Sequence, residues 1–369
     1  MPFDVRDFAG ASAGERAASP RNRKLVGGWL LLICAMILVM VVLGGVTRLS
    51  GSGLSIMEWA PLSGALPPLN HAEWEQLFAL YKTIPQYRIL NDGMDLSGFQ
   101  HIFWLEWTHR LWGRLIGIAF LGPLVFFWAT GRIERRLRPR LLLLFLLGGL
   151  QGAVGWFMVA SGFFPDSTAV APLRLAIHLA LALILYAAIF WTALGTLHPA
   201  PRTDARAGWL QPALMAFLCL LSLTIVAGSL VAGTHAGFEY NTFPLMEGHL
   251  VPADYGRLQP FIRNLTQNLA AVQFDHRLLA TLTVLAGAIV VATGWRQPDS
   301  AIRRAVAAIA ALLALQYLLG VTTLLLVVPT ALAVLHQANA VLVLTAGLWA
   351  LHQARVPRAA PVLKIAPAV

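Results

Sequence analysis

Charged residues are scarce in this chain. Asp, Glu, Lys and Arg make up 12% of its 369 residues, whereas hydrophobic residues make up 58%. Soluble globular domains carry about 25% charged residues, so the composition excludes an ordinary soluble fold. Cysteine is also scarce, with only Cys34 and Cys219. This count excludes a disulfide framework, and we expect both residues to be buried free thiols.

Long hydrophobic runs, in contrast, are abundant. A helix needs roughly 20 apolar residues to cross a hydrocarbon core of about 30 Å, and backbone in lipid must satisfy its hydrogen bonds internally. The predicted fold class is therefore an all-α membrane protein with eight transmembrane helices. We expect these spans near residues 25–47, 105–128, 139–160, 173–196, 209–232, 271–293, 304–327 and 330–352.

Acidic residues number 17 and basic residues 27, which gives a formal net charge of +10. The basic residues gather before the first span and after the second, fourth, sixth and eighth spans. On the other side, the connection 161–172 has no Lys or Arg, and the longer 233–270 has only Arg257 and Arg263. The positive-inside rule then places both termini in the cytoplasm. Since the charge follows topology, we expect membrane lipid as the surroundings and no nucleic-acid partner.

The first 20 residues argue against an organellar targeting sequence. They contain Asp4, Asp7 and Glu15, whereas transit peptides are poor in acidic residues. We therefore expect the first span to stay in the mature protein, in the inner (plasma) membrane of a bacterium rather than the mitochondrial inner membrane.

The sequence indicates two copies of one four-span unit. In each half a first span is followed by a long outer loop, and the next span opens with His-Arg. A four-span repeat keeps its membrane orientation, so a pseudo-two-fold axis along the membrane normal would relate two four-helix bundles. The predicted divisions are a cytoplasmic tail at 1–24, a first bundle at 25–196, a linker at 197–208, a second bundle at 209–353 and a cytoplasmic tail at 354–369.

Four of the ten histidines lie inside spans, two in each half: His109, His178, His276 and His336. Each lies four to seven residues from the outer end of its span. A single intramembrane histidine is usually a packing residue, but four at matching positions indicate a site. Paired imidazoles on facing helices can hold a heme iron from both sides. Zinc, the competing metal, usually takes three or four protein ligands, so heme is favoured.

Charged residues surround the first of these histidines. Arg110 and Arg277 directly follow a histidine, and we expect them to pair with heme propionates unless they snorkel to the interface. Arg114 lies one turn deeper and is a better candidate for a buried partner. Glu106 lies one turn before its histidine, where the second half has Gln273. This difference suggests that one site does chemistry and the other holds a cofactor.

Five sequence blocks resemble a known family. They are GGVTRLSGSGLSIMEWAPLSGALPPLN at 44–70, FQHIFWLEWTHRLWGRLIG at 99–117, the span around His178, QFDHRLLA at 273–280 and LHQANA at 335–340. Together they resemble heme A synthase, over about residues 25–353. Members of that family are eight-span proteins that oxidise the methyl group at porphyrin carbon 8 of heme O to a formyl group, which gives heme A for cytochrome c oxidase. Neither long outer loop here contains cysteine, so the chain resembles the subclass shared by proteobacterial and mitochondrial enzymes.

The resemblance implies roles for these residues. His276 and His336 would bind a resident heme b through its iron, and His109 and His178 would flank the substrate heme O. Glu106 matches a carboxylate considered catalytically important, and we interpret it as assisting proton transfer or stabilising positive charge at the methyl carbon.

The reaction also needs dioxygen and an electron donor, and heme O synthase is an expected contact. Because iron held by two histidines has no open position, either one histidine leaves or heme b only relays electrons while the substrate heme activates oxygen.

Other readings remain open at this point. The glycine-rich stretch 44–53 could form a lid over the first pocket or serve packing alone. A bis-histidine diheme b-type cytochrome in quinol-linked electron transfer would have similar histidines, and a heme transporter would also show internal repeats.

Overall fold

The structure is a computed structural model that describes residues 19–61, 63–199 and 208–355. Within these ranges it has eight helices long and apolar enough to cross a membrane. The first four are α2 (Pro20–Leu49), α5 (Leu96–Ala129), α6 (Arg138–Ala160) and α7 (Pro172–Leu197). The second four are α8 (Leu210–Thr234), α10 (Leu269–Trp295), α11 (Ser300–Leu325) and α12 (Thr330–Gln353). The predicted eight-span all-α fold is confirmed, and the chain is a multi-pass membrane protein.

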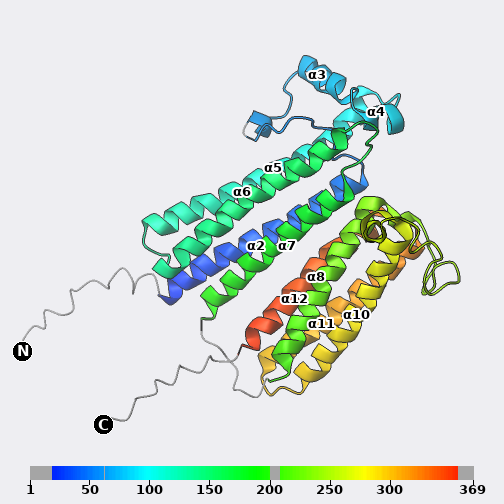
Figure 1. Cartoon of the computed structure of the whole chain (residues 1–369). Coiled ribbons are helices and arrows are strands. Elements are labelled where there is room, and N and C mark those ends of the chain that lie inside the picture. The colour runs from blue at the N-terminus through cyan, green and yellow to red at the C-terminus, as the bar shows by residue number, and fades with distance from the viewer. Residues whose placement is uncertain (1–18, 62, 200–207, 356–369) are drawn as a thin grey trace, which may run out of the picture.

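The eight helices form two four-helix groups that lie side by side (Figure 1). In the first group α2 packs on α5 and α7, and α6 packs on the same two helices. In the second group α8 packs on α10 and α12, and α11 packs on the same two helices. Each helix therefore has the neighbours of its counterpart four spans away. This pattern supports the proposal of a pseudo-two-fold axis and of a bundle in each half.

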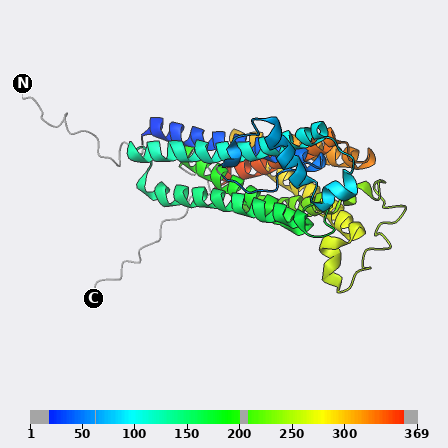
Figure 2. The same cartoon turned by 90° about the horizontal axis from the view of Figure 1, so that it is seen from above.

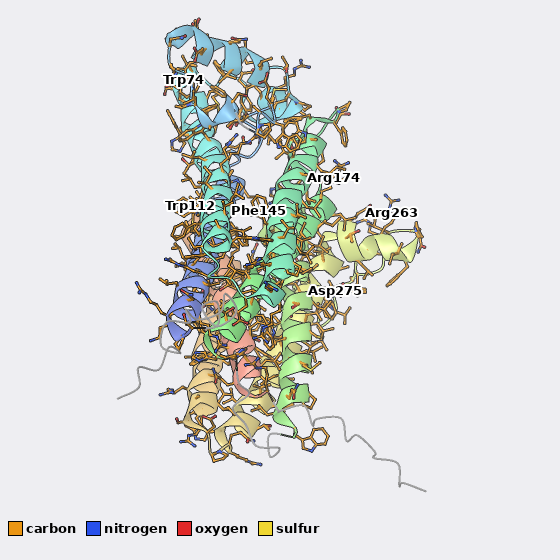
Figure 3. All side chains as sticks on the ribbon, turned by 90° about the vertical axis from the view of Figure 1, so that its left-hand side faces the viewer. Trp74, Trp112, Phe145, Arg174, Arg263 and Asp275 are labelled. Atoms are coloured by element: carbon orange, nitrogen blue, oxygen red, sulfur yellow. The ribbon has the colours of Figure 1, made fainter. Side chains whose placement is uncertain are left out.

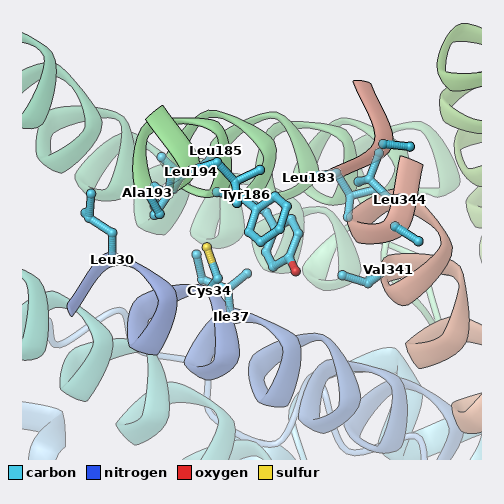
Figure 4. Close-up of a cluster of buried hydrophobic side chains, with 14 of the residues drawn as sticks. Leu30, Cys34, Ile37, Leu183, Leu185, Tyr186, Ala193, Leu194, Val341 and Leu344 are labelled. Atoms are coloured by element: carbon cyan, nitrogen blue, oxygen red, sulfur yellow. The ribbon is translucent and has the colours of Figure 1, made fainter. Parts of the chain in front are cut away.

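The two groups share one hydrophobic core. Cys34 of α2, Tyr186 of α7 and Leu344 of α12 all belong to it, as Figure 4 shows. Polar contacts also cross this interface. The hydroxyl oxygens of Tyr186 and Thr345 lie 2.6 Å apart, and the Gln337 amide donates to the Val41 carbonyl at 2.9 Å. The outer faces carry exposed apolar side chains such as Ile118, as lipid-facing surfaces require.

The Tyr186–Thr345 contact gives a stability prediction. Tyr186→Phe removes a hydrogen bond between the two groups while it leaves the ring packed, so we expect a loss of about 0.5–1.5 kcal/mol in unfolding free energy. Denaturant unfolding in detergent measures it. Thr345→Val should add little once Tyr186 is changed, and fully additive effects would show that the two hydroxyls do not interact.

Two outer segments lie at the same end of the bundle, beyond the beginnings of α5 and α10 (Figures 1 and 2). The first contains α3 (His71–Tyr81) and α4 (Pro85–Leu90), and the second contains α9 (Asn264–Gln267). Trp74 of α3 lies at this end, above the membrane part of α5 (Figure 3). A small aromatic core that includes Tyr81 and Phe99 holds α3 against α5.

The structure corrects three expectations. The second span begins at Leu96 rather than near 105, because Asp95 caps the helix by accepting a hydrogen bond from the Gly98 amide and the first turns pack into the aromatic core. The stretch 44–53 does not form a loop as a whole, because α2 continues to Leu49. Cys34 is a buried free thiol as expected, but Cys219 is exposed, on a lipid-facing side of α8.

Candidate functional site

The four intramembrane histidines share one packing feature. Each imidazole lies against a glycine of a neighbouring helix in its own half, in the space that a side chain would otherwise fill. A Cβ atom added at the glycine would lie 2.8–3.2 Å from the ring, closer than real Cβ atoms normally approach. The pairs are Gly44 with His109, Gly155 with His178, Gly228 with His276, and Gly320 with His336.

Polar contacts orient three of the rings. The Thr224 carbonyl accepts a hydrogen bond from Nδ1 of His276 at 3.1 Å. This bond leaves Nε2 of His276 as the free nitrogen, which is the usual arrangement for a metal-binding histidine.

Glutamines lie beside the other two rings. The Gln151 amide nitrogen is 3.1 Å from Nδ1 of His178, and the Gln316 amide nitrogen is 3.2 Å from Nδ1 of His336. Each glutamine lies four residues before the glycine that contacts the same histidine. The second half adds Asn339, whose side-chain amide donates to Oε1 of Gln316 at 2.8 Å.

Glu106 is buried, with 2% of its surface exposed. Its Oε2 accepts hydrogen bonds from the Ser55 hydroxyl at 2.8 Å and from the Ile56 amide at 2.9 Å. Its Oε1 accepts from Nε and Nη2 of Arg110, at 3.0 and 2.6 Å. Arg110 also donates to the carbonyls of Ile56 and Glu58. The pair thus joins α5 to the segment that follows α2.

The second half repeats this arrangement with a neutral residue. Gln273 is equally buried, and its Oε1 accepts from Arg277 at 2.7 Å. Its amide nitrogen donates to the carbonyls of Ala236 and Glu239. Arg277 donates to two further carbonyls of that outer segment, those of residues 240 and 242. Both halves therefore fasten an outer segment to the helix that carries the first histidine of that half.

Comparison with known proteins identifies the family of the chain. A family profile described as cytochrome oxidase assembly protein, COX15-CtaA, matches residues 27–348. The chain belongs to this family. Its relatives include "Heme A synthase" of Granulibacter bethesdensis, 58% identical over 92% of this chain and 91% of the relative. "Heme A synthase 2" of Acidiphilium cryptum is 51% identical over 93% and 95%, and "Heme A synthase" of Rhodospirillum centenum is 48% identical over 92% and 90%.

The arginines of this family member donate to acceptors within the protein. Arg114 donates to the carbonyls of Ala60 and Pro61 at 2.9 Å, so it has a partner in the outer segment, like Arg110 and Arg277. Two buried donors, Nη1 of Arg114 and Nε of Arg277, have no partner within the described part of the chain. Pairing of the three arginines with heme propionates stays a prediction.

The residues present fit heme better than a simple metal ion. No group of three or more His, Cys, Asp or Glu side chains that could hold a metal occurs among the described residues, whereas zinc usually needs at least three. A heme needs only one or two axial side chains and a cavity between helices. Two histidines in each half, each packed against a glycine, can supply the axial side chains.

Sequence reasoning missed Gly155, Gly320, Gln151 and Gln316. A signal for them exists, because QGAVG at 151–155 and QYLLG at 316–320 share the spacing Gln-x3-Gly in corresponding spans. Aligning the two halves with each other would have found it. Arg110 and Arg277 follow Glu106 and Gln273 by four residues, so they carry the same kind of signal. The backbone partners at Ile56, Ala236 and Glu239 carry none.

Proposed function

We propose that this chain is a heme A synthase that oxidises the C8 methyl group of heme O to a formyl group, through a hydroxymethyl intermediate, for cytochrome c oxidase. The observation that carries the proposal is the glycine-packed pair of histidines in each half, in a chain that covers nearly the full length of relatives named heme A synthase. The reaction is an oxidation, so the chain is an oxidoreductase.

The two pairs have different proposed duties. His276 and His336 hold a resident heme b by its iron, and His109 and His178 flank heme O in the first half. A bound heme b supplies one-electron redox chemistry that no side chain provides. The more fixed pair fits the permanent cofactor, because Thr224, Gln316 and Asn339 restrain its rings.

The chain's own residues bind and orient the substrate. The carboxylate groups of heme O need cationic partners near the outer end of the first half. Arg114 lies there with charge that its carbonyl contacts do not neutralise, and Arg110 lies there already paired with Glu106. Arg277 holds the position equivalent to Arg110 in the second half, beside the proposed heme b. Each hydroxylation consumes one dioxygen, two electrons and two protons and releases one water. Loss of a further water from the resulting diol gives the aldehyde.

The setting follows from the charge pattern and the chemistry. We propose a bacterial inner membrane with both termini in the cytoplasm, so that the two outer segments face the opposite side. Heme O is apolar and reactive, so direct transfer from heme O synthase is the proposed supply. The electron donor is a separate partner.

The test is to extract and separate the hemes from membranes of a host that makes heme O but not heme A, with and without this protein. We expect heme A, or its hydroxymethyl precursor, only when the protein is present. Bound heme b with heme O unchanged, in a well-expressed sample with sufficient reductant, would instead support a diheme b-type cytochrome. Heme movement across the membrane without oxidation would support a transporter.

A further inference from the structure

The Glu106 carboxylate is fully occupied. It accepts four hydrogen bonds, two from Arg110 and one each from Ser55 and Ile56. A carboxylate has about four acceptor sites, so these four donors fill them. Loss of this carboxylate would leave the Ile56 amide and the Arg110 guanidinium without a buried acceptor, which is costly.

In the second half, the position equivalent to Glu106 is occupied by Gln273, which is not an acid. Gln273 carries no charge and exchanges no proton, yet it binds Arg277 and two carbonyls of the outer segment. The shared feature of Glu106 and Gln273 is attachment of an outer segment, not acidity.

The segment that Glu106 holds, Ser55–Pro61, runs beside α5 at the level of His109, from Glu106 to Arg114. Arg110 and Arg114 bind carbonyls along its length, which fixes it to α5 near His109. Its Trp59 ring stacks on Trp156 of α6, with centroids 6.3 Å apart and planes 9° apart. Trp156 directly follows Gly155, the residue that contacts His178. The segment therefore bridges the helices that shape both histidine positions.

We infer that Glu106 is a positioning residue, which acts on heme A formation by fastening the Ser55–Pro61 segment beside His109 rather than by carrying protons. This inference rests on the proposed function for its effect on activity. Its structural part, attachment of the segment, can be measured without any turnover.

The experiment is hydrogen exchange with mass spectrometry on the full-length protein in lipid nanodiscs, paired with heme extraction. A glutamine has one oxygen, so if Glu106→Gln keeps that oxygen on Arg110, as Gln273 does on Arg277, its NH2 group faces the Ile56 amide and leaves that amide without an acceptor. Peptides covering Ser55–Pro61 should then exchange at least tenfold faster, and heme A should fall in proportion. Trp59→Ala removes the stacking on Trp156 and no proton-carrying group, and it should produce the same two changes. Glu75→Gln, at an exposed carboxylate of α3, is the matched control and should change neither.

Three readouts separate the alternatives. The heme b spectrum of the second half reports whether each variant is folded, and the residual activity of Glu106→Gln should keep the unmodified pH profile. A Glu106→Gln variant that loses heme A while the segment exchanges normally would overturn the inference. So would a Trp59→Ala variant with a loosened segment and full heme A. If the unmodified protein makes no heme A, the proposed function fails, while the exchange rates still decide whether Glu106 fastens the segment.

Discussion

Replacing His276 with alanine is expected to remove the b-type heme from the purified protein, whereas replacing His109 should leave that heme in place and abolish heme A. The reason is that the two histidines lie in different halves, each packed with helices of its own half. Loss of an axial ligand should lower heme retention by more than about tenfold, since even changes to residues behind a ligand cost 10–100-fold in affinity.

The measurement is the ratio of heme b absorbance to protein after purification, together with extraction of the total heme. His336→Ala should behave like His276→Ala, and His178→Ala like His109→Ala. His101→Ala is the matched control, because His101 is exposed on the same helix as His109. Added imidazole should partly restore the heme b spectrum of His276→Ala, as the missing ligand is then supplied from solution.

A different distribution would contradict the assignment. If His109→Ala lost the resident heme and His276→Ala kept it, the two halves would have exchanged duties. If no histidine substitution changed the heme content, the glycine-packed imidazoles would be packing residues. A spectrum unchanged in all four variants would also mean that the histidine pairs give no support to the proposed function.

Hydropathy was sufficient to predict the eight spans, because the cost of exposing backbone and charge in lipid leaves few alternatives. It could not give the start of α5. Residues 96–104 are too mixed in character to register as a membrane span, and their helix depends on packing against the outer aromatic core. The face of Cys219 was unpredictable for a related reason, since α8 is apolar all round and its sequence carries no strong sidedness.

The histidines of the candidate site were predictable because the two halves repeat them. Their surroundings were not. The sequence suggested that Glu106 stands free for chemistry and that Arg110 awaits a ligand, yet the two bind each other and the chain between α2 and α3. Such contacts depend on how a loop folds back over a helix, and backbone acceptors leave no residue pattern to read. The charged residues therefore indicated a candidate site but not the groups that they contact.

Replacing Gly155 with valine is expected to abolish heme A formation, while the same change at Gly152 is tolerated. A Cβ atom at Gly155 would lie 2.9 Å from Cε1 of His178, whereas nothing lies within 4 Å of one at Gly152. Overpacking of this kind costs typically about 1–3 kcal/mol or displaces the neighbouring side chain. The side chain displaced here is a proposed heme contact.

Comparing two glycines of one helix separates the effect of the added side chain from the effect of a changed helix propensity. Both positions lie within α6, so any change in helix propensity is shared, and valine is a better helix former than glycine in any case. Gly155→Ala should be intermediate, because the added methyl group can be accommodated by a small shift of the ring. Heme b in the second half should be unaffected in all three variants.

Gly320→Val provides the mirror experiment in the other half. A Cβ atom there would lie 2.9 Å from Cε1 of His336, so this variant should lose heme b, as His336→Ala does. Heme b content and extracted heme A measure the two predictions.

Equal heme A yields from Gly155→Val and Gly152→Val would show that the position of His178 is not set by glycine packing. Loss of heme b in Gly155→Val would show that a change in the first half also disturbs heme binding in the second half. With the expected pattern, the two glycines hold equivalent positions in the two halves, and each determines where one proposed heme contact lies.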